Sequence, residues 1–317
     1  MAGWTDRDIP DQHGRTVLVT GANSGLGLRS AEALARAGAT VILACRDQAK
    51  AAAARDAVAA VATGDEPWCV PLDLADLSSV RDAASTLGAR LDHLDVLMNN
   101  AGVMAIPLRR TADGFEAQFG TNHLGHFALT GLVLPLLLAA PAPRVVTTSS
   151  QAHRAGRMRW HDPHWRTGYR KWLAYGQSKL ANLLFTFELD RRAREAGTNL
   201  LAVAAHPGYA ATHLQAVGPE LAGHRLQARM MQLVNRVVAQ SDTQGAWPQL
   251  YAATMGDVEG GAYYGPGGPF EVRGHPKRTR PMASARDPRD AARLWELSER
   301  ETGVIYDWSP ARSERSG

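Results

Sequence analysis

Cysteine is scarce in this chain of 317 residues, which contains only Cys45 and Cys69. Two cysteines are too few for a disulfide framework and fit a reducing compartment. The opening residues 1–14 lack the apolar core of a signal peptide. The most apolar run, residues 127–140, is too short to cross a bilayer and contains Pro135. We therefore expect a cytoplasmic protein without a membrane partner, in which this run is a buried or interface helix.

Excess charge is also small, because 35 Lys and Arg against 31 Asp and Glu give a formal charge of +4. The densest basic cluster, residues 272–280, has no interleaved aromatic side chains and belongs to no nucleic-acid-binding motif. We therefore expect a solvated charged face there and no nucleic-acid partner. Phosphate groups on a small ligand would balance part of the positive charge.

Short β-branched runs alternate with longer helical patterns along the chain. The expected strands are residues 16–20, 39–44, 68–74, 95–102, 144–150 and 199–208. These runs show no polar alternation, which is typical of a parallel sheet covered on both faces. Alternating strands and helices predict βαβ units with right-handed crossovers. The sequence therefore predicts an α/β fold with a single doubly wound parallel sheet, a Rossmann fold, and helices on both faces.

The chain has no Pro/Gly/Ser-rich linker and no internal repeat, so we expect a single domain. Its expected parts are a cofactor-binding and catalytic core (14–210), a substrate lid with the last helix and strand (211–265), and a C-terminal extension (266–317). Within the second part, residues 212–240 have helical spacing and two possible glycine hinges, Gly218 and Gly223. They form either a lid or a pair of core-packed helices. Residues 287–304 predict a capped amphipathic helix ending at Gly303.

The first expected strand leads directly into TGANSGLG, which places Gly21, Gly25 and Gly27 in a turn before a helix. Strand, tight glycine turn and helix form the context of a dinucleotide site, where backbone N–H groups meet a pyrophosphate. The spacing is G-x-x-x-G-x-G, which differs from the commoner G-x-G-x-x-G. A plain turn rich in small residues is the alternative, and the position of the turn favours the cofactor.

The second expected strand ends in LACRD, and this ending bears on the type of cofactor. An NAD-selective site would place a carboxylate at the strand tip to hold the ribose 2′-hydroxyl. Here Cys45 occupies that place and Arg46 follows, whose guanidinium suits a 2′-phosphate. The pattern favours NADP(H) over NAD(H). Arg46 could instead be a solvent-exposed loop residue, and Asp47 could partly neutralise the site.

Tyr175 and Lys179 are four residues apart in AYGQSKLAN, at the start of an expected helix over 175–195. This spacing places both side chains on one helical face. A phenol with its ordinary pKa of about 10 is a poor proton donor at neutral pH. A nearby ammonium stabilises the phenolate and lowers that pKa. We therefore expect Tyr175 to act as a general acid/base and Lys179 to lower its pKa.

Taken together, these motifs resemble the short-chain dehydrogenase/reductase family over nearly the whole chain. TGANSGLG is similar to its cofactor loop, residues 73–74 to its adenine-contacting pair, NNAG at 99–102 to its ribose-contacting turn, and HPGYAAT at 206–212 to its segment over the nicotinamide. The resemblance implies a catalytic tetrad of Asn122, Ser150, Tyr175 and Lys179. The cofactor-binding residues that it implies are Gly21, Asn23, Ser24, Gly25, Leu26, Gly27, Arg46, Asp73, Leu74, Asn100, Ala101, Gly102, Tyr175, Lys179, Pro207, Gly208 and Thr212.

The resemblance also implies a role for each member of the tetrad. Ser150 would polarise the substrate oxygen, with Ser149 as the alternative serine. Asn122 would lie in a helix bend and hold a water that extends a proton path from Lys179, which also binds the nicotinamide ribose. Asparagine is otherwise unfavourable inside an apolar helical stretch.

Four segments, TNHLGHF, SSQAH, AYGQSKLANLLF and GAYYGPGG, resemble the retinol-dehydrogenase-like branch, which includes protochlorophyllide reductases. The membrane-bound retinol dehydrogenases carry an apolar N-terminal anchor, and its absence suggests a soluble bacterial-type relative. The family often assembles through the helices corresponding to 113–139 and 175–195, so a homodimer or homotetramer is a further expectation.

Residues 151–173 form an insert between the expected catalytic serine and tyrosine. Its histidines and Asp162 match no zinc motif and its arginines would oppose a cation, so we expect no metal. A flap beside the substrate is the preferred interpretation. Its aromatic residues, which either line an apolar pocket or pack the loop, are Trp160, Trp165, Tyr169 and Trp172.

The favoured function is an NADP(H)-dependent oxidoreductase that interconverts a carbonyl and an alcohol on a small, apolar or aromatic substrate. One alternative is a non-catalytic dinucleotide sensor or scaffold, which usually loses the tyrosine or the lysine. An epimerase or dehydratase would typically have the loop T-G-x-x-G-x-x-G, unlike this chain. Reduction of a carbon–carbon double bond stays open.

Overall fold

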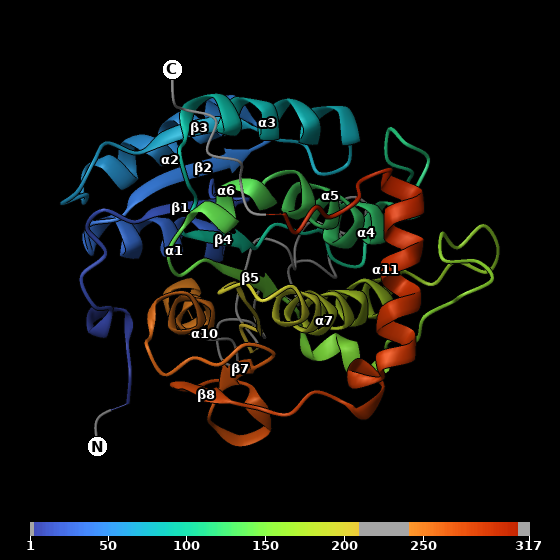
Figure 1. Cartoon of the computed structure of the whole chain (residues 1–317). Coiled ribbons are helices and arrows are strands. Elements are labelled where there is room, and N and C mark those ends of the chain that lie inside the picture. The colour runs from blue at the N-terminus through green and yellow to red at the C-terminus, as the bar shows by residue number, and fades with distance from the viewer. Residues whose placement is uncertain (1–2, 209–240, 310–317) are drawn as a thin grey trace.

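The computed structural model describes residues 3–208 and 241–309, which form an eight-stranded sheet flanked by helices (Figure 1). The strands are β1 (Thr16–Thr20), β2 (Thr40–Cys45), β3 (Trp68–Pro71), β4 (Val96–Asn99), β5 (Arg144–Thr148), β6 (Leu201–Ala205), β7 (Tyr263–Pro266) and β8 (Pro276–Arg278). Their order is β3-β2-β1-β4-β5-β6-β7-β8, parallel throughout except for the pair β7 and β8. The predicted doubly wound α/β fold is confirmed, with an antiparallel edge strand that the sequence did not indicate.

Most of the helices lie close to the periodic segments that predicted them, with one clear exception. Their bounds are α1 (Gly25–Arg36), α2 (Gln48–Ala59), α3 (Leu77–Arg90), α4 (Ala117–Phe119), α5 (Gly125–Leu132), α6 (Leu134–Ala139), α7 (Lys171–Glu195), α10 (Asp242–Thr254) and α11 (Pro288–Thr302). The exception is the segment 113–139, which is divided into α4, a π-helical turn η2 (Gly120–Leu124), α5 and α6. The helix that carries Tyr175 begins at Lys171, four residues earlier than expected.

Both faces of the sheet are buried, and β1 shows why its sequence has no polar alternation. Val17 and Val19 pack into a core with residues of α1, α2 and α10. Leu18, which points to the opposite face, packs into a second core with residues of α3, α5 and α7. These two sets of helices form the layers on either side of the sheet (Figure 1).

The order of the strands places the functional site. Strand β1 lies between β2 and β4, so the connections after β1 and after β3 lead to opposite sides of the sheet. Ligands of doubly wound sheets bind at the carboxyl ends of the strands, at this reversal. Residues that follow β1, β4 and β5 include Gly21, Asn100 and Ser150. The topology therefore brings three predicted site segments to one edge of the sheet.

The C-terminal helix α11 packs across α7 and α5 (Figure 1). Its Trp295 is 1% exposed, and its ring centre lies 5.1 Å from that of Phe127 and 4.5 Å from that of Tyr306. Asp287 caps the start of the helix, and Gly303 ends it in a left-handed conformation, as predicted. The C-terminal extension thus contributes to the second core.

The apolar run 127–140 is shared between α5 and α6, which meet at Val133. In the part of the chain that the structure describes, every helix is too short or too polar to cross a membrane. The proposed lid segment 212–240 lies outside the described residues.

We predict that the chain unfolds as one domain and that Trp295→Ala lowers its free energy of unfolding by about 3–5 kcal/mol, because the change leaves a large cavity in the second core. Urea denaturation followed by circular dichroism and by tryptophan fluorescence measures this loss. Ile305→Ala, at a side chain 70% exposed, is the control and should change the free energy by less than about 0.5 kcal/mol. A separate early transition in Trp295→Ala would show that the extension folds independently.

Candidate active site

A cleft of about 1010 Å³ opens at the carboxyl ends of the strands. Every predicted cofactor-binding residue in the described part of the chain lines it. Thr212, the remaining one, lies outside the described residues. Of the predicted tetrad, Ser150, Tyr175 and Lys179 line the cleft, and Asn122 is fully buried behind its wall.

The glycine turn forms a cradle at the start of α1. Gly21 has a φ of +67°, which favours glycine. A Cβ atom on Gly27 would lie 2.4 Å from the carbonyl oxygen of Gly21 and 2.6 Å from Nδ2 of Asn100. The first turn of α1 can therefore approach the end of β1 only without a side chain at position 27. This cradle leaves the N-terminus of α1 facing the cleft, where it fits the pyrophosphate of a dinucleotide.

The turn after β4 is held by Thr20, the last residue of β1. The Thr20 hydroxyl accepts hydrogen bonds from the backbone N–H groups of Asn100, at 3.0 Å, and Ala101, at 2.9 Å. The Asn100 side chain donates to the Thr20 carbonyl at 2.8 Å. These bonds fix the NNAG segment against the glycine turn, so both line the cleft as one surface.

At the far end of the glycine turn, two cations line the cleft. Arg46 is largely exposed and lies 3.8 Å from a carboxylate oxygen of Asp73. Lys50 follows on α2, 3.3 Å from Asp47, which caps that helix. The Asp47 carboxylate therefore caps α2 and pairs with Lys50. We expect it to neutralise Arg46 less than the sequence suggested. Sequence analysis missed Lys50, although its spacing of four residues from Arg46 was a usable signal.

Cys45, at the tip of β2, is buried, and this burial raises the pKa of its thiol to about 12. The thiol is therefore uncharged at neutral pH. The tip of β2 offers no carboxylate to a ribose, as the sequence indicated.

Asn122 lies in the π-helical turn η2, where Gly125 N–H donates to the Gly120 carbonyl. Its side chain accepts from Val103 N at 2.8 Å and donates to Val103 O and to the Ser178 hydroxyl, both at 2.9 Å. A Cβ atom on Gly102 would lie 3.0 Å from Oδ1 of Asn122 and 3.5 Å from Nζ of Lys179. The expected helix bend is thus a π-helix, and it brings Asn122 close to Lys179.

Ser150 follows β5 and begins the short helix η3 (Gln151–Ala155). Its hydroxyl accepts from Ala152 N at 3.2 Å and also interacts with the Tyr175 hydroxyl. Ser149 differs, because its hydroxyl donates to the Lys179 carbonyl at 2.8 Å and packs β5 against α7. This arrangement favours Ser150 as the serine that faces a substrate.

Tyr175 and Lys179 lie on the same face of α7, with the Lys179 ammonium 5.8 Å from the centre of the Tyr175 ring. Burial raises the pKa of Tyr175 to about 12, opposed by the Ser150 hydroxyl. Burial lowers the pKa of Lys179 to about 8. Burial thus opposes the lowering of the Tyr175 pKa that we expected from Lys179, and that effect of Lys179 stays a prediction. Loss of solvation dominates, and Lys179 donates to the Thr148 carbonyl at 3.1 Å.

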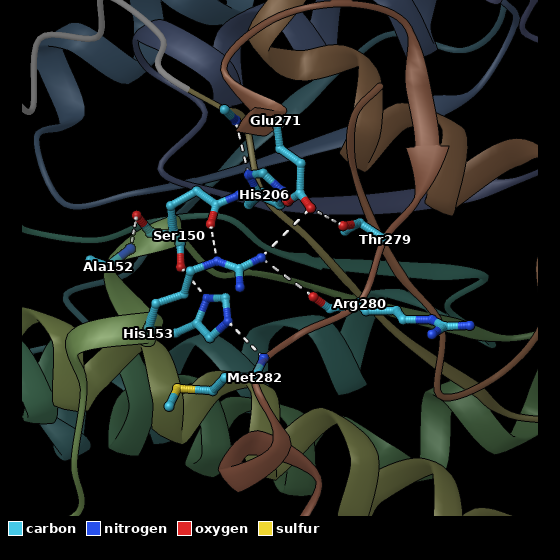
Figure 2. Close-up of polar contacts among 11 residues, drawn as sticks. Ser150, Ala152, His153, His206, Glu271, Thr279, Arg280 and Met282 are labelled. Atoms are coloured by element: carbon cyan, nitrogen blue, oxygen red, sulfur yellow. Dashed lines mark hydrogen bonds and ion pairs between the residues drawn. The ribbon is translucent and has the colours of Figure 1, made fainter. Parts of the chain in front are cut away.

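A polar cluster around Glu271 contributes to the lining of the cleft (Figure 2). The Glu271 carboxylate accepts from Gln151 Nε2 at 2.5 Å and from the Thr279 hydroxyl, and it pairs with His206 Nε2 at 2.9 Å. Arg154 lies 3.6 Å from the same carboxylate. The hydrogen bond with His206 is the main cause of a Glu271 pKa of about 2. Figure 2 shows His206, which follows β6, and Thr279, which follows β8, beside Glu271 of the β7–β8 connection.

The residue before Glu271 reaches the cleft with an uncovered ring. Phe270 and Glu271 both have left-handed backbone conformations, with φ values of 54° and 55°, and the Phe270 side chain is 92% exposed. Such conformations cost roughly 1–2 kcal/mol each for non-glycine residues, and the four partners of Glu271 offset that cost. Sequence analysis missed Phe270, Glu271, Gln151 and Arg154, which are brought together only by the fold.

The aromatic residues of the 151–173 insert have different surroundings. Trp172 is 51% exposed, lines the cleft and lies edge-on to Tyr175, with 6.4 Å between ring centres. The other three pack the insert onto the domain, because Trp160 stacks with Arg293, Trp165 is buried, and the Tyr169 hydroxyl donates to Ile106 O. Within residues 3–208 and 241–309, His, Cys, Asp and Glu side chains form no cluster that could hold a metal ion.

Comparisons with known proteins agree with this geometry. The family model for short chain dehydrogenases matches residues 15–220. Retinol dehydrogenase 14 of Mus musculus is 40% identical over 305 residues, which cover 92% of this chain and 87% of that protein. Retinol dehydrogenase 13 of Homo sapiens is 39% identical over 296 residues, covering 92% and 85%.

A crystal structure of an uncharacterised protein from Mycobacterium paratuberculosis is 46% identical, with a TM-score of 0.79, and the match covers 96% of this chain and all of that one. The match over most of the chain, the identity to both retinol dehydrogenases and the shared fold lead to one conclusion. This chain belongs to the short-chain dehydrogenase/reductase family, in its retinol-dehydrogenase-like branch.

Proposed function

We propose that this protein is an NADP(H)-dependent oxidoreductase that interconverts a carbonyl and an alcohol on a small, apolar or aromatic substrate, with Tyr175 as the general acid/base. The observation that carries the proposal is that Ser150, Tyr175 and Lys179 line the same cleft as the glycine cradle. A non-catalytic sensor would need the cradle alone. The family membership supports an oxidoreductase that uses an NAD(P) dinucleotide and a small-molecule substrate.

The nicotinamide, when bound, supplies or accepts the hydride, and the protein handles the proton. With a pKa of about 12, Tyr175 carries its proton at neutral pH and can donate it to the oxygen of a reduced carbonyl. Ser150 adds a second hydrogen bond to that oxygen. Lys179, with a pKa of about 8, is mostly charged at pH 7 and stabilises the phenolate left behind. Asn122, directly behind Lys179, fits the start of a path that returns the proton.

NADP(H) is proposed over NAD(H) because Arg46 and Lys50 both line the end of the cleft beside the β2 tip. Their charges suit a 2′-phosphate. A structure assigned as an NAD(P)-dependent gluconate 5-dehydrogenase from Beutenbergia cavernae contains NADP; it is 27% identical to this chain, with a TM-score of 0.57, and the match covers 77% of this chain and 91% of that one.

The apolar part of the substrate is proposed to lie against Trp172 and Phe270, the exposed aromatic side chains of the cleft. Aromatic rings that are uncovered in a cleft gain free energy when a ligand covers them. Cytoplasmic location and a homodimeric or homotetrameric state stay predictions. Reduction of a carbon–carbon double bond is the second candidate, and a substrate panel separates it from carbonyl reduction.

Tyr175→Phe should lower kcat for carbonyl reduction by at least about 100-fold, because it removes the proton donor. NADPH oxidation followed at 340 nm, with aldehydes, ketones and activated alkenes as substrates, measures the loss. The affinity for NADPH should change less than about twofold, since the ring is retained. Tyr251→Phe, outside the cleft, is the matched control. Carbonyl turnover that survives in Tyr175→Phe would contradict the mechanism.

Arg46→Ala should weaken NADPH binding by about 10- to 100-fold and NADH binding by less than about twofold, because a charge-assisted bond to phosphate is lost only with NADPH. Fluorescence titration with both cofactors gives the two dissociation constants. Arg55→Ala removes a partly exposed arginine, further along α2 and outside the cleft, and should leave both dissociation constants unchanged. Equal losses for the two cofactors would overturn the NADP(H) preference.

Phe270→Ala should raise KM for an aromatic aldehyde by about tenfold, the size of effect expected when one apolar side chain no longer covers the substrate. KM for acetaldehyde, which is too small to reach the ring, should stay within about twofold. Phe270→Leu keeps an apolar side chain and should show a smaller change. A similar loss for both aldehydes would show that Phe270 does not select the substrate.

A further inference from the structure

His126 is buried in α5, one turn after Asn122, and none of the proposed chemistry uses it. Its side chain has a partner at each nitrogen. Nδ1 lies 3.0 Å from the backbone oxygen of Asn122, and Nε2 lies 2.9 Å from the hydroxyl of Thr20. The ring therefore connects the π-helical turn with the end of β1.

The partners fix the tautomer of His126. A backbone carbonyl only accepts hydrogen bonds, so Nδ1 must carry the proton that binds Asn122 O. Nε2 of the neutral ring is then an acceptor, and the Thr20 hydroxyl donates to it. The remaining acceptor sites of that hydroxyl are filled by Asn100 N and Ala101 N. Its proton has a nearer partner in His126, at 2.9 Å, than in Met98 O, at 3.3 Å.

The same partners exclude a charged ring. A second proton, on Nε2, would point at a hydroxyl oxygen whose acceptor sites are already used. Burial and the charge of Lys179 oppose it as well, and the pKa of His126 is lowered to about 4. His126 is thus neutral at physiological pH and does not act as an acid or a base. What it provides is a fixed connection.

The connection joins two parts of the candidate active site. On one side, Thr20 holds the NNAG turn, which lines the cleft. On the other side, Asn122 accepts a hydrogen bond from the backbone N–H of Val103 and lies close to Lys179. We call these two residues, Asn122 and Lys179, the Asn122–Lys179 corner. No side chain in the described residues other than His126 bonds to both Thr20 and Asn122.

We propose that His126 is a positioning residue that couples the Asn122–Lys179 corner to the cofactor-contacting turn through Thr20. The inference rests on the proposed function, because it assigns Asn122 to the proton path and the NNAG turn to the cofactor. The Nδ1 side of the ring bonds to Asn122, in the proton path, and the Nε2 side bonds to Thr20, which holds the cofactor-contacting turn. Substitutions that keep one half should therefore separate cofactor affinity from turnover.

Two amide substitutions make this test. In His126→Asn, the amide nitrogen occupies the place of Nδ1, so the bond to Asn122 is kept and that to Thr20 is lost. We expect an approximately tenfold higher dissociation constant for NADPH, with kcat within about threefold. In His126→Gln, the amide reaches the place of Nε2, so the bond to Thr20 is kept. We expect an approximately tenfold lower kcat, with NADPH affinity within about twofold.

His123→Asn is the matched control. His123 is equally buried in the preceding turn, but its Nε2 contacts Ser298 and its ring packs against Phe119. Its replacement should lower the melting temperature and leave kcat and NADPH affinity unchanged. Equal changes of kcat and affinity in the two His126 variants, or changes that follow the melting temperature alone, would overturn the proposal.

A measurement on the wild-type protein covers the case in which the variants fail to fold. Nitrogen-15 NMR should show His126 with a protonated Nδ1 and an unprotonated Nε2, unchanged between pH 5.5 and 8. A ring that titrates in this range, or the opposite tautomer, would overturn the proposal. Wild-type turnover is measured first, because an inactive wild type would contradict the proposed function and not the hydrogen-bond assignment.

Discussion

The loss of solvation at the base of the cleft is the constraint on which the candidate chemistry depends. Tyr175 and Lys179 are both buried on α7, and burial moves their pKa values apart, to about 12 for the tyrosine and about 8 for the lysine. Each group is pushed toward its neutral form. A phenol that keeps its proton suits the reductive direction, in which a proton must be delivered. The reverse direction, oxidation of an alcohol, requires Tyr175 as a phenolate. Its formation depends on further stabilising interactions in the cleft beside Lys179.

Much of the fold follows from local patterns in the sequence. Strands β1 to β6 and helices α2, α3, α7 and α11 lie close to the periodic segments that predicted them, because burial on both faces of a sheet demands continuous apolar runs. The candidate site was predictable for the same reason. Its motifs follow successive strands, and the carboxyl ends of parallel strands share one edge.

Other features depend on contacts that no local pattern reveals. The family resemblance indicated a helix bend at Asn122, but no local pattern showed that the bend is a π-helical turn with one additional residue. Glu271 meets Gln151 across 120 positions of the chain. The pKa of Tyr175 depends on how deeply the fold buries the ring, and the spacing to Lys179 alone suggested the opposite direction. Burial is a property of the whole packed molecule, so residue spacing could not supply it.

The left-handed turn at Phe270 and Glu271 separates two tasks between neighbouring positions. The backbone shape is fixed by the carboxylate of Glu271 and its partners, and the adjoining ring contributes little to packing because it is almost wholly exposed. Replacing that ring should therefore disturb the scaffold very little. Under the proposed function, a substitution at position 270 would change the range of compounds that the protein converts at small cost to its folding.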